Sequence, residues 1–517
     1  MRRIGIDVGG TNTDAVLIED GRVAGAVKAP TSEDVTTGIL DSLKDLGATG
    51  VLEGKRIDGV MIGTTHFINA VVQRRQLTKV AALRLGMPAS ASLPPFCDWP
   101  EDLAELVRGG VWMVEGGHEY DGRLFMPLDE AAVTKAAQEM RLAGLKAVGI
   151  SAIFSPLDPS HEKRAAELVA SVIPDAAITC SSDLGRIGLL ERENAGLLNA
   201  ALADLARDTI AAFEAAIRDS GIDAPLFITQ NDGTVAEAGQ ARRLPVYSFA
   251  SGATNSMRGA AYLSGLSDAM VIDVGGTTTD VGQLKNGFPR EANSVVKVGG
   301  VRTLFRMPDL LSIGLGGGSH VALESANGGP LKVGPVSVGY RLLREGIAFG
   351  GKQLTTTDVA VASGLLNLGD RAKVAHLDGA LCRKVLGEAA RMAEEAIDRM
   401  KTEAGDVPLI AVGGGAFLVP DTLPGVSKVI HVEHGDCANA VGAAIAQVSG
   451  ECDQIFKDMT RRDAIAAAQG IANDRAVAAG ADRKTLATIE SEDMPLAYLP
   501  GNSVRVRVRV VGDVAAG

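Results

Sequence analysis

Apolar and turn-forming residues alternate over short distances along the first part of the chain. Short apolar runs separated by Gly, Asn and Asp predict strands at residues 3–8, 15–19 and 23–28. Apolar side chains at helical spacing predict helices at residues 33–45, 128–143 and 161–173. Further strands are predicted at residues 58–63 and 147–154. This alternation of strands and helices is typical of an α/β fold.

The second part of the chain continues the alternation. The longest helical pattern covers residues 189–219 and is interpreted as the link between two lobes. Strands are predicted at residues 226–230, at 246–250, within a strand–turn–strand unit at 269–284, and at 408–417, where a strand enters a glycine turn. Helices are predicted at residues 379–402 and 438–448, and an Ala-rich helix with two closing strands after about residue 456. The closing VRVRVRVV (504–511) predicts a half-buried strand with a solvated cationic face.

One internal repeat divides the chain. IGIDVGGTNTD at residues 4–14 recurs as MVIDVGGTTTD at residues 270–280, an offset of 266 residues between Asp7 and Asp273. Because this period is far too long for a solenoid, it indicates two similar lobes, each with one strand–turn–strand unit. We therefore expect an amino-terminal lobe at residues 1–185, a second lobe at 186–455 and a small carboxy-terminal α+β extension at 456–517.

Composition narrows the function classes. A chain of 517 residues is too long for one ordinary core, in agreement with two lobes. Its net charge of −12 argues against a nucleic-acid surface. The five cysteines form no CxxC pair, which argues against zinc, iron–sulfur or disulfide frameworks and fits a reducing compartment. No secretory signal and no apolar run of roughly 20 residues is found, so we expect a soluble cytoplasmic protein without a membrane contact.

The repeated turn has the composition of a phosphate site. Glycines let several backbone N–H groups approach phosphate oxygens, and hydroxyl and amide side chains add donors. The candidate phosphate-binding residues are Gly9, Gly10, Thr11, Asn12 and Thr13 in the first copy, and Gly275, Gly276, Thr277 and Thr278 in the second. Asp7 and Asp273 could each hold a magnesium ion or orient a nucleophile. One copy alone fits an ordinary hairpin equally well, whereas two copies with the same Asp and Thr favour a two-sided phosphate clamp.

Three other segments are candidates for ligand contact. Gly413, Gly414 and Gly415 follow an apolar strand and could let a base or ribose lie against the backbone, although a bare turn has the same pattern. GTTHFINA (63–70) places Thr64, Thr65, His66 and Asn69 at a predicted helix start, where a ligand contact and a simple helix cap both fit. GLGGGSH (314–320) lacks the last glycine of a dinucleotide fingerprint, and no P-loop pattern exists. For ERENAGLLNAAL (191–202) a solvated helix face is expected.

The order of these motifs resembles that of the actin/Hsp70/sugar-kinase ATPase superfamily: a phosphate hairpin, a second phosphate hairpin, a GGG turn and a small-residue helix. Within it the chain resembles the A (alpha) subunit of the hydantoinase/oxoprolinase family over nearly its whole length. The matching segments are RIGIDVGGTNTDAVLIEDG, GTTHFINA, LLERENAGLLNAAL, ITQNDG (228–233), SIGLGGGS, LKVGPVSVG and TTTDVAVASG (355–364).

The resemblance implies a two-lobed actin-like ATPase fold with a cleft between the lobes. It implies ATP and Mg²⁺ as cofactors, with Asp7 and Asp273 as catalytic and magnesium-binding residues and Gly413–Gly415 at adenosine. It also implies a cyclic amide substrate near Thr64–Asn69, Gly316 and Gly317, a B-type hydrolase partner subunit and an oligomer. The implied reaction is phosphorylation of the ring carbonyl oxygen before hydrolytic ring opening. The alternatives are a small-molecule kinase of the same fold and an ATP-switched reactivating or assembly factor.

Overall fold

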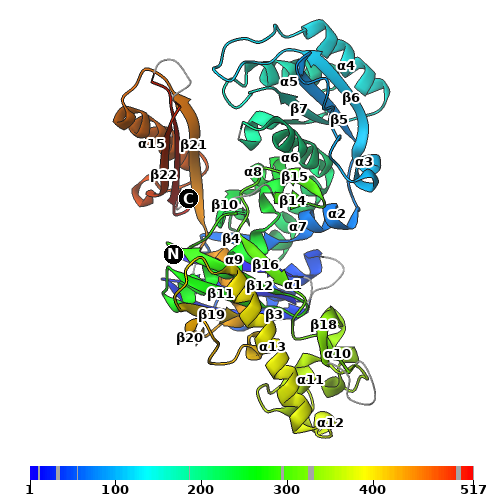
Figure 1. Cartoon of the computed structure of the whole chain (residues 1–517), viewed down its shortest axis with the longest axis vertical. Coiled ribbons are helices and arrows are strands. Elements are labelled where there is room, and N and C mark those ends of the chain that lie inside the picture. Colours follow the sequence, from blue (N-terminus) through cyan, green and yellow to red (C-terminus); the bar gives the residue numbers. More distant parts are fainter. Residues whose placement is uncertain are drawn as a thin grey trace.

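The computed structural model of the chain describes residues 1–9, 12–30, 35–54, 56–185, 187–292, 296–323, 331–496 and 502–515. A nine-stranded sheet in the order β22-β23-β21-β10-β9-β4-β1-β2-β3 runs through the first lobe into the carboxy-terminal unit (Figure 1). Its strands are β1 (Arg2–Val8), β2 (Asn12–Glu19), β3 (Arg22–Pro30), β4 (Gly59–Thr64), β9 (Leu226–Thr229), β10 (Thr234–Glu237), β21 (Gln447–Phe456), β22 (Ala487–Pro495) and β23 (Val504–Gly512). The predicted first hairpin is therefore part of a larger sheet.

Helices cover both faces of this sheet. Ile4 and Ile6 of β1 pack in one core with α1 (Val35–Ala48) and α7 (Ala203–Asp219), and α8 (Ala238–Arg243) joins the same core. Gly5 alternates with these residues and so faces α14 (Ala438–Ala444) on the opposite side. Asp7 lies on the same side as Gly5, which places it toward α14.

The second sheet repeats the pairing of the first. Its order is β13-β12-β11-β19-β20, with β16 beside β12. The strands are β11 (Ala269–Val274), β12 (Thr279–Lys285), β13 (Phe288–Pro289), β16 (Leu310–Ile313), β19 (Val407–Val412) and β20 (Val426–His431). β11 pairs antiparallel with β12 and parallel with β19, as β1 pairs with β2 and β4. Opposite residues match as well: Asp7 lies across from Asp14, and Asp273 across from Asp280.

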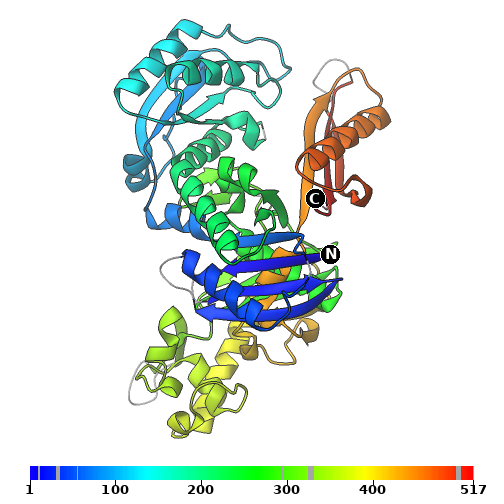
Figure 2. The same ribbon diagram turned by 180° about the vertical axis from the view of Figure 1, so that it is seen from behind.

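Helices also flank the second sheet. The long helix α13 (Gly379–Met400) shares a core with β11 and β19. α9 (Ser251–Ser264) packs on the other face through Met257 and Ala260. A smaller part follows β16 and forms one end of the molecule, opposite the cyan α/β unit of residues 80–180 at the other end (Figure 2). It contains β17 (Ser319–Leu323), β18 (Leu331–Ser337), the 3₁₀ turns η3 (Gly339–Arg341) and η4 (Ile347–Phe349), α10 (Leu342–Glu345), α11 (Thr356–Ala362) and α12 (Arg371–Val374).

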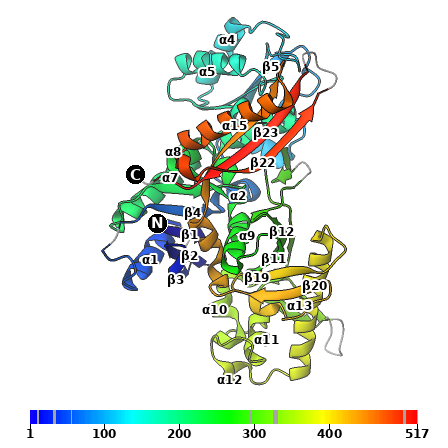
Figure 3. The same ribbon diagram turned by 90° about the vertical axis from the view of Figure 1, so that its left-hand side faces the viewer.

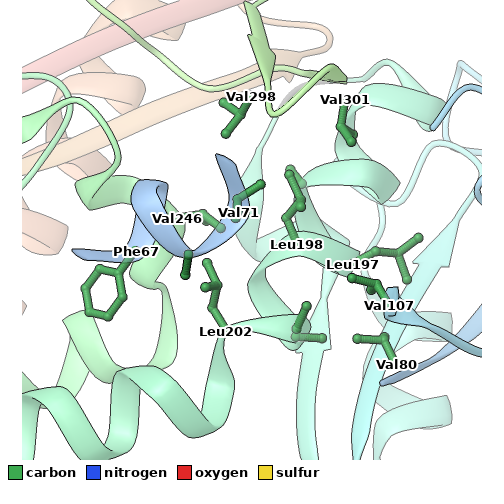
Figure 4. Packing of buried hydrophobic residues seen from close by; sticks show 14 of the residues in the cluster. Phe67, Val71, Val80, Val107, Leu197, Leu198, Leu202, Val246, Val298 and Val301 are labelled. Carbon is green, nitrogen blue, oxygen red and sulfur yellow. The ribbon is translucent and has the colours of Figure 1, made fainter. Parts of the chain in front are cut away.

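An additional α/β unit is inserted after β4 and α2 (His66–Gln73). Its four-stranded parallel sheet has the order β6-β5-β7-β8, with strands β5 (Val80–Met87), β6 (Arg108–Glu115), β7 (Ala147–Ala152) and β8 (Ala177–Cys180). Its helices are α3 (Glu101–Val107), α4 (Glu130–Leu142) and α5 (Ser160–Val172), followed by the turn η1 (Ser181–Leu184). α6 (Leu189–Ala201) covers the remaining face, and its core includes Phe67, Val71, Leu197 and Leu198, with Val298 and Val301 from the ribbon β14 (Val296–Val298) and β15 (Val301–Thr303) (Figure 4).

The prediction that α6 has a solvated face is wrong. Arg192, Glu193 and Asn194 are all buried. Glu193 accepts hydrogen bonds from Arg84 Nε at 2.7 Å and Ser151 Oγ at 2.6 Å, and Asn194 Oδ1 accepts one from Trp99 Nε1 at 2.7 Å. These charged and polar groups can be buried because partners from other segments satisfy them.

Three other predictions of secondary structure are also wrong. Residues 189–219 form two helices, α6 and α7, which separate at Leu202; the start of α7 still packs in the core of α6, whereas residues 210–217 pack in the core of β1. Residues 246–250 are not a strand: Pro245–Ser248 is the 3₁₀ turn η2, and the Asn231 side chain binds both Val246 O and Ala250 N. The predicted helix 438–448 ends at Ala444, because Gln447 already pairs with β10.

The arginines of the closing strand β23 are half-buried or, at Arg509, buried, in contrast to the predicted solvated face. Its valines pack on the alanine stripe of α15 (Arg461–Ala478), which has small residues at every fourth position. Its arginines form ion pairs that join β23 to distant segments: Arg505 with Asp453, Arg507 with Glu490, and Arg509 with Asp232 and Glu291. Arg306 joins the same network through Glu291, Glu451 and Glu490, and the Arg509 side chain is only 8% exposed. Paired charges of this kind fix the carboxy-terminal unit on the rest of the protein.

Candidate active site

Asp7 lies near the end of β1, between Asp14 on β2 and Gly63 on β4. Its side chain is buried, and Asn439 Nδ2 of α14 donates a hydrogen bond to Asp7 Oδ2 at 3.2 Å. Burial, followed by the negative charge of Asp14, raises the pKa of Asp7 to about 7, although the Asn439 hydrogen bond acts in the opposite direction. The site therefore disfavours an isolated negative charge on Asp7.

Asp273 is the equivalent residue of β11. Burial raises its pKa to about 6, the neighbouring Ser256 hydroxyl lowers it, and Asp280 raises it. The glycine turn after β19 contacts this carboxylate closely: a methyl group on Gly413, whose φ is +88°, would lie 2.3 Å from Asp273 Oδ1. A side chain cannot be accommodated there, which explains the first glycine of the GGG turn.

The two aspartates lie near enough for the charge of one to act on the other. The charge of Asp273 contributes to the raised pKa of Asp7, and Lys28 lowers the pKa of both. Lys28 Nζ donates to Asp14 Oδ2 at 3.0 Å and to the carbonyl oxygen of Asp436 at 3.1 Å, so it connects the first sheet to the segment before α14. Lys28 is not among the site residues predicted from the sequence, although it lies directly opposite Asp14 in the register of β2 and β3.

The hairpin turns have matching geometry. Gly9 N donates to Asn12 O at 3.1 Å, and Gly275 N donates to Thr278 O at 2.9 Å. Gly10 and Thr11 lie outside the described residues. Thr277 and Thr278 are exposed, Gly276 is half-buried, and Asn12 is half-buried, so these candidates are accessible at the turns.

Thr13 is placed differently. It alternates with Asp14 along β2 and therefore points to the opposite face of the sheet, where a methyl group on Gly38 of α1 would lie 2.7 Å from Thr13 Oγ1. Its side chain lies behind the hairpin, away from the face that carries Asp7.

Gly316 and Gly317 lie against the second hairpin. Gly317 N donates to Gly275 O at 3.0 Å, and a methyl group on Gly316 would lie 2.6 Å from Thr277 N. The hydroxyls of Thr356 and Thr357 donate to Gly317 O at 2.8 and 2.7 Å. The predicted substrate residues Gly316 and Gly317 therefore support the hairpin turn from one side.

The GGG turn is fixed at both ends and open in the middle. Gly413 N donates to Gly435 O at 2.9 Å, and Gly415 N donates to Val274 O at 2.7 Å. A methyl group on Gly414 would have no atom within 4 Å, so this backbone is free to meet a flat group.

The segment Thr64–Asn69 borders the first hairpin. Thr64 is buried, and its Oγ1 accepts a hydrogen bond from His66 N at 3.2 Å, while Thr65 Oγ1 accepts one from Asn69 Nδ2 at 3.3 Å. Burial lowers the pKa of His66, which favours the neutral imidazole. Ser251 Oγ, at the start of α9, donates to Thr64 O at 3.3 Å. Thr65 precedes α2, but its side chain makes no capping hydrogen bond to the helix backbone, so the predicted cap at Thr65 is wrong, while the ligand contact stays a prediction.

Two further observations bear on ligands. Among the described residues, no group of three or more His, Cys, Asp and Glu side chains is placed to hold a metal ion, and no helix is both long and apolar enough to span a membrane. A cavity of about 570 Å³ lies away from the hairpins, between the inserted α/β unit and the carboxy-terminal unit, with Ser182, Tyr247 and Glu451 in its wall.

Duplicated hairpins in two sheets, with helices packed between those sheets, define a two-lobed protein of the actin-like fold. The fold is shared with the crystal structure of ATP-dependent caprolactamase from Pseudomonas jessenii, at 20% identity and a TM-score of 0.74 over 99% of this chain and 88% of that one. It is also shared with nucleotide-free acetone carboxylase, at 18% identity and a TM-score of 0.68 over 100% and 89% of the chains.

The chain belongs to the hydantoinase/oxoprolinase family. The profile of the hydantoinase/oxoprolinase N-terminal region matches residues 3–173, and the hydantoinase/oxoprolinase profile matches residues 192–393. Curated relatives include caprolactamase subunit alpha of Pseudomonas jessenii, 28% identical over 78% of this chain and 58% of that protein. Another is acetone carboxylase beta subunit of Xanthobacter autotrophicus, 25% identical over 70% of this chain and 54% of that protein. The chain thus spans somewhat more than half the length of these relatives.

Proposed function

We propose that this chain is the ATP-dependent subunit of an amidohydrolase that phosphorylates the carbonyl oxygen of a cyclic amide or imide. The observation that carries the proposal is the pair of equivalent aspartates, Asp7 and Asp273, on duplicated hairpins, with the charge of Asp273 acting on Asp7. Family membership and the lactam named in the caprolactamase relative support the substrate class.

The residues present fit Mg²⁺·ATP. One buried and one half-buried carboxylate with raised pKa values, beside a single nearby lysine, leave negative charge that a divalent cation would neutralise. Magnesium bound with a nucleotide uses one or two carboxylates together with phosphates and water, so a three-carboxylate cluster is not required. Asp7 and Asp273 would hold the ion, which would supply charge neutralisation at the phosphates. The hairpin amides would bind the phosphates, and Gly413–Gly415 the adenosine.

The proposed chemistry overcomes the low reactivity of an unstrained lactam. The ring carbonyl oxygen attacks the γ-phosphorus of ATP, and the bond from that phosphorus to the bridging oxygen breaks to release ADP. Water adds to the activated carbon, the ring C–N bond breaks, and the nitrogen takes a proton. A second water hydrolyses the resulting acyl phosphate to a carboxylate and phosphate. We assign these later steps to a partner subunit of the B type, because the relatives are named as subunits.

A second candidate function follows from the carboxylase relatives. Acetone carboxylase and acetophenone carboxylase subunits match at 25% and 26% identity, close to the 28% of the caprolactamase subunit. In that case the phosphorylated carbonyl compound would proceed to carboxylation. Turnover that requires bicarbonate and leaves no ring-opened product would favour this candidate.

The test is ADP release across a panel of cyclic amides, measured with and without the candidate partner subunit. Asp7→Asn and Asp273→Asn should each lower turnover at least about 100-fold while the protein stays folded. Asp41→Asn, on the exposed face of α1, is the matched control and should retain normal turnover. Near-normal turnover in both aspartate variants, or no stimulation by any cyclic amide with the partner present, would remove the proposal.

A further inference from the structure

Two helices cross between the sheets and exchange close contacts (Figure 3). α14 follows the second sheet in the chain but packs on β1, β2 and β4, whereas α9 follows β10 of the first sheet and packs on β11, β12 and β19 as well as on β4. At the crossing, a methyl group on Gly442 would lie 1.8 Å from Asn255 O, and one on Gly259 would lie 1.9 Å from Ala438 O. Each helix therefore presents a glycine to the backbone of the other, in a reciprocal arrangement.

The reciprocity defines a second pair of equivalent positions. Three residues before Gly442 stands Asn439, and three residues before Gly259 stands Ser256. Asn439 donates to Asp7 at 3.2 Å. Ser256 lies beside Asp273 and lowers the pKa of that carboxyl, but its hydroxyl makes no hydrogen bond of good geometry. The duplicated aspartates thus meet equivalent helix positions that carry different donors.

A short hydrogen-bonded route joins Asn439 to the second lobe. Gly413, which abuts Asp273, donates its N–H to Gly435 O at 2.9 Å, and Gly435 lies four residues before Asn439. Within this segment, Asp436 O accepts from Lys28 Nζ at 3.1 Å. A methyl group on Gly5 would lie 2.0 Å from Ala440 O, so α14 packs directly on the backbone of β1. The position of residues 435–439 therefore fixes the donor that meets Asp7.

We propose that Asn439 is a positioning residue that holds the Asp7 carboxylate in its metal-binding orientation and links that orientation to the GGG turn of the second lobe. Ser256 is its weaker counterpart at Asp273. This inference rests on the proposed function, because it assumes that Asp7 meets magnesium and ATP. It adds residues from the interlobe helices to a site otherwise built from hairpins.

The test compares Asn439→Ala, Asn439→Ser and Ser256→Ala with the control Asn473→Ala. Asn473 is a half-buried helical asparagine of α15 with one side-chain hydrogen bond, from Gln469 at 3.1 Å. ADP affinity is measured by calorimetry with and without magnesium, and kcat and KM for ATP are measured under the conditions of wild-type turnover.

Asn439→Ala should lower kcat about tenfold with KM for ATP within about twofold of wild type, since one charge-assisted hydrogen bond is lost. The gain in ADP affinity on adding magnesium should fall by a similar factor, while ADP affinity without magnesium stays unchanged. Asn439→Ser, which restores a donor, should recover part of both losses. Ser256→Ala should have a smaller effect, and Asn473→Ala none.

If Asn439→Ala leaves both kcat and the increase in ADP affinity on adding magnesium unchanged, the inference is overturned and the proposed function stands. A uniform loss of melting temperature and of ADP binding in both Asn439 variants would also overturn it, because that result indicates a structural role only. Failure of the wild-type protein to bind ADP at all would instead refute the proposed function.

Discussion

Adding one methyl group to Gly442 tests the helix crossing directly. The new carbon in Gly442→Ala would lie 1.8 Å from Asn255 O and 2.6 Å from its carbonyl carbon. Non-bonded carbon and oxygen need more than 3 Å, so the helices must separate by roughly 1.5 Å in a region packed to interior density. Both contacts are backbone atoms, and neither can rotate away as a flexible side chain would.

The expected cost follows from two opposing effects. Alanine in place of glycine within a helix normally stabilises by about 0.5–1 kcal/mol. Overpacking of a rigid contact costs about 1–3 kcal/mol, and α14 also has no room toward Gly5. We expect a net loss of about 1–2 kcal/mol, which for a chain of 517 residues corresponds to a melting temperature about 1–2 °C lower.

Scanning calorimetry measures this effect against Gly470→Ala on α15, where a methyl group meets no atom within 4 Å. That control should be stabilised. Gly259→Ala should resemble Gly442→Ala, and the double variant should cost less than the sum, because both methyl groups force the same separation. A Gly442→Ala protein that melts at or above the temperature of wild type would refute the described crossing.

Three further predictions concern charge, nucleotide contact and domain attachment. Burial raises the pKa of Asp7 to about 7, so the folded protein holds a proton that the unfolded chain has lost above about pH 4. Stability should therefore fall as pH rises from about 4 to 7 in magnesium-free buffer, and Asp7→Asn should flatten this slope; an unchanged slope would contradict the assignment. Gly414→Val should weaken ADP binding about tenfold without a change in melting temperature, whereas Gly405→Val, equally unhindered, should leave ADP binding unchanged; equal affinities in calorimetry would exclude an adenosine contact. Arg306→Met removes a cation shared by three carboxylates and should lower the free energy of unfolding by about 2 kcal/mol or more in urea titrations; wild-type stability would show that the network contributes nothing.

The hairpins were predictable because their signals are local. Each needs an apolar strand, a glycine turn and a second strand within about a dozen residues, and the repeat identifies two such units. The side-chain direction of Thr13 was also available, since it alternates with Asp14. The small-residue helix containing Asn439 was predicted as well, but its contact was not: Asn439 and Asp7 are separated by 432 residues, and no local pattern reports which surface such a helix meets.

The buried charges show the same limit in another form. Alternation of Val and Arg predicts the strand β23, yet it cannot reveal that Glu291 and Asp232 lie over the arginine face. Likewise, Glu193 looks like a solvated helix residue until Arg84 is placed against it. A charge pattern identifies the face of an element, whereas its burial depends on long-range partners.

The pairing of β10 with β21 has a consequence for synthesis. Thr234 lies beside Gln447, and β21 in turn carries β23 along its other edge. During synthesis, more than 200 residues are therefore added after β10 before β21 exists to cover the open edge of β10. An uncovered strand edge is a template for association between nascent chains. We expect truncations that end before β21 to aggregate, and the full sheet to close late in folding, because such distant pairing carries a high loop-closure entropy.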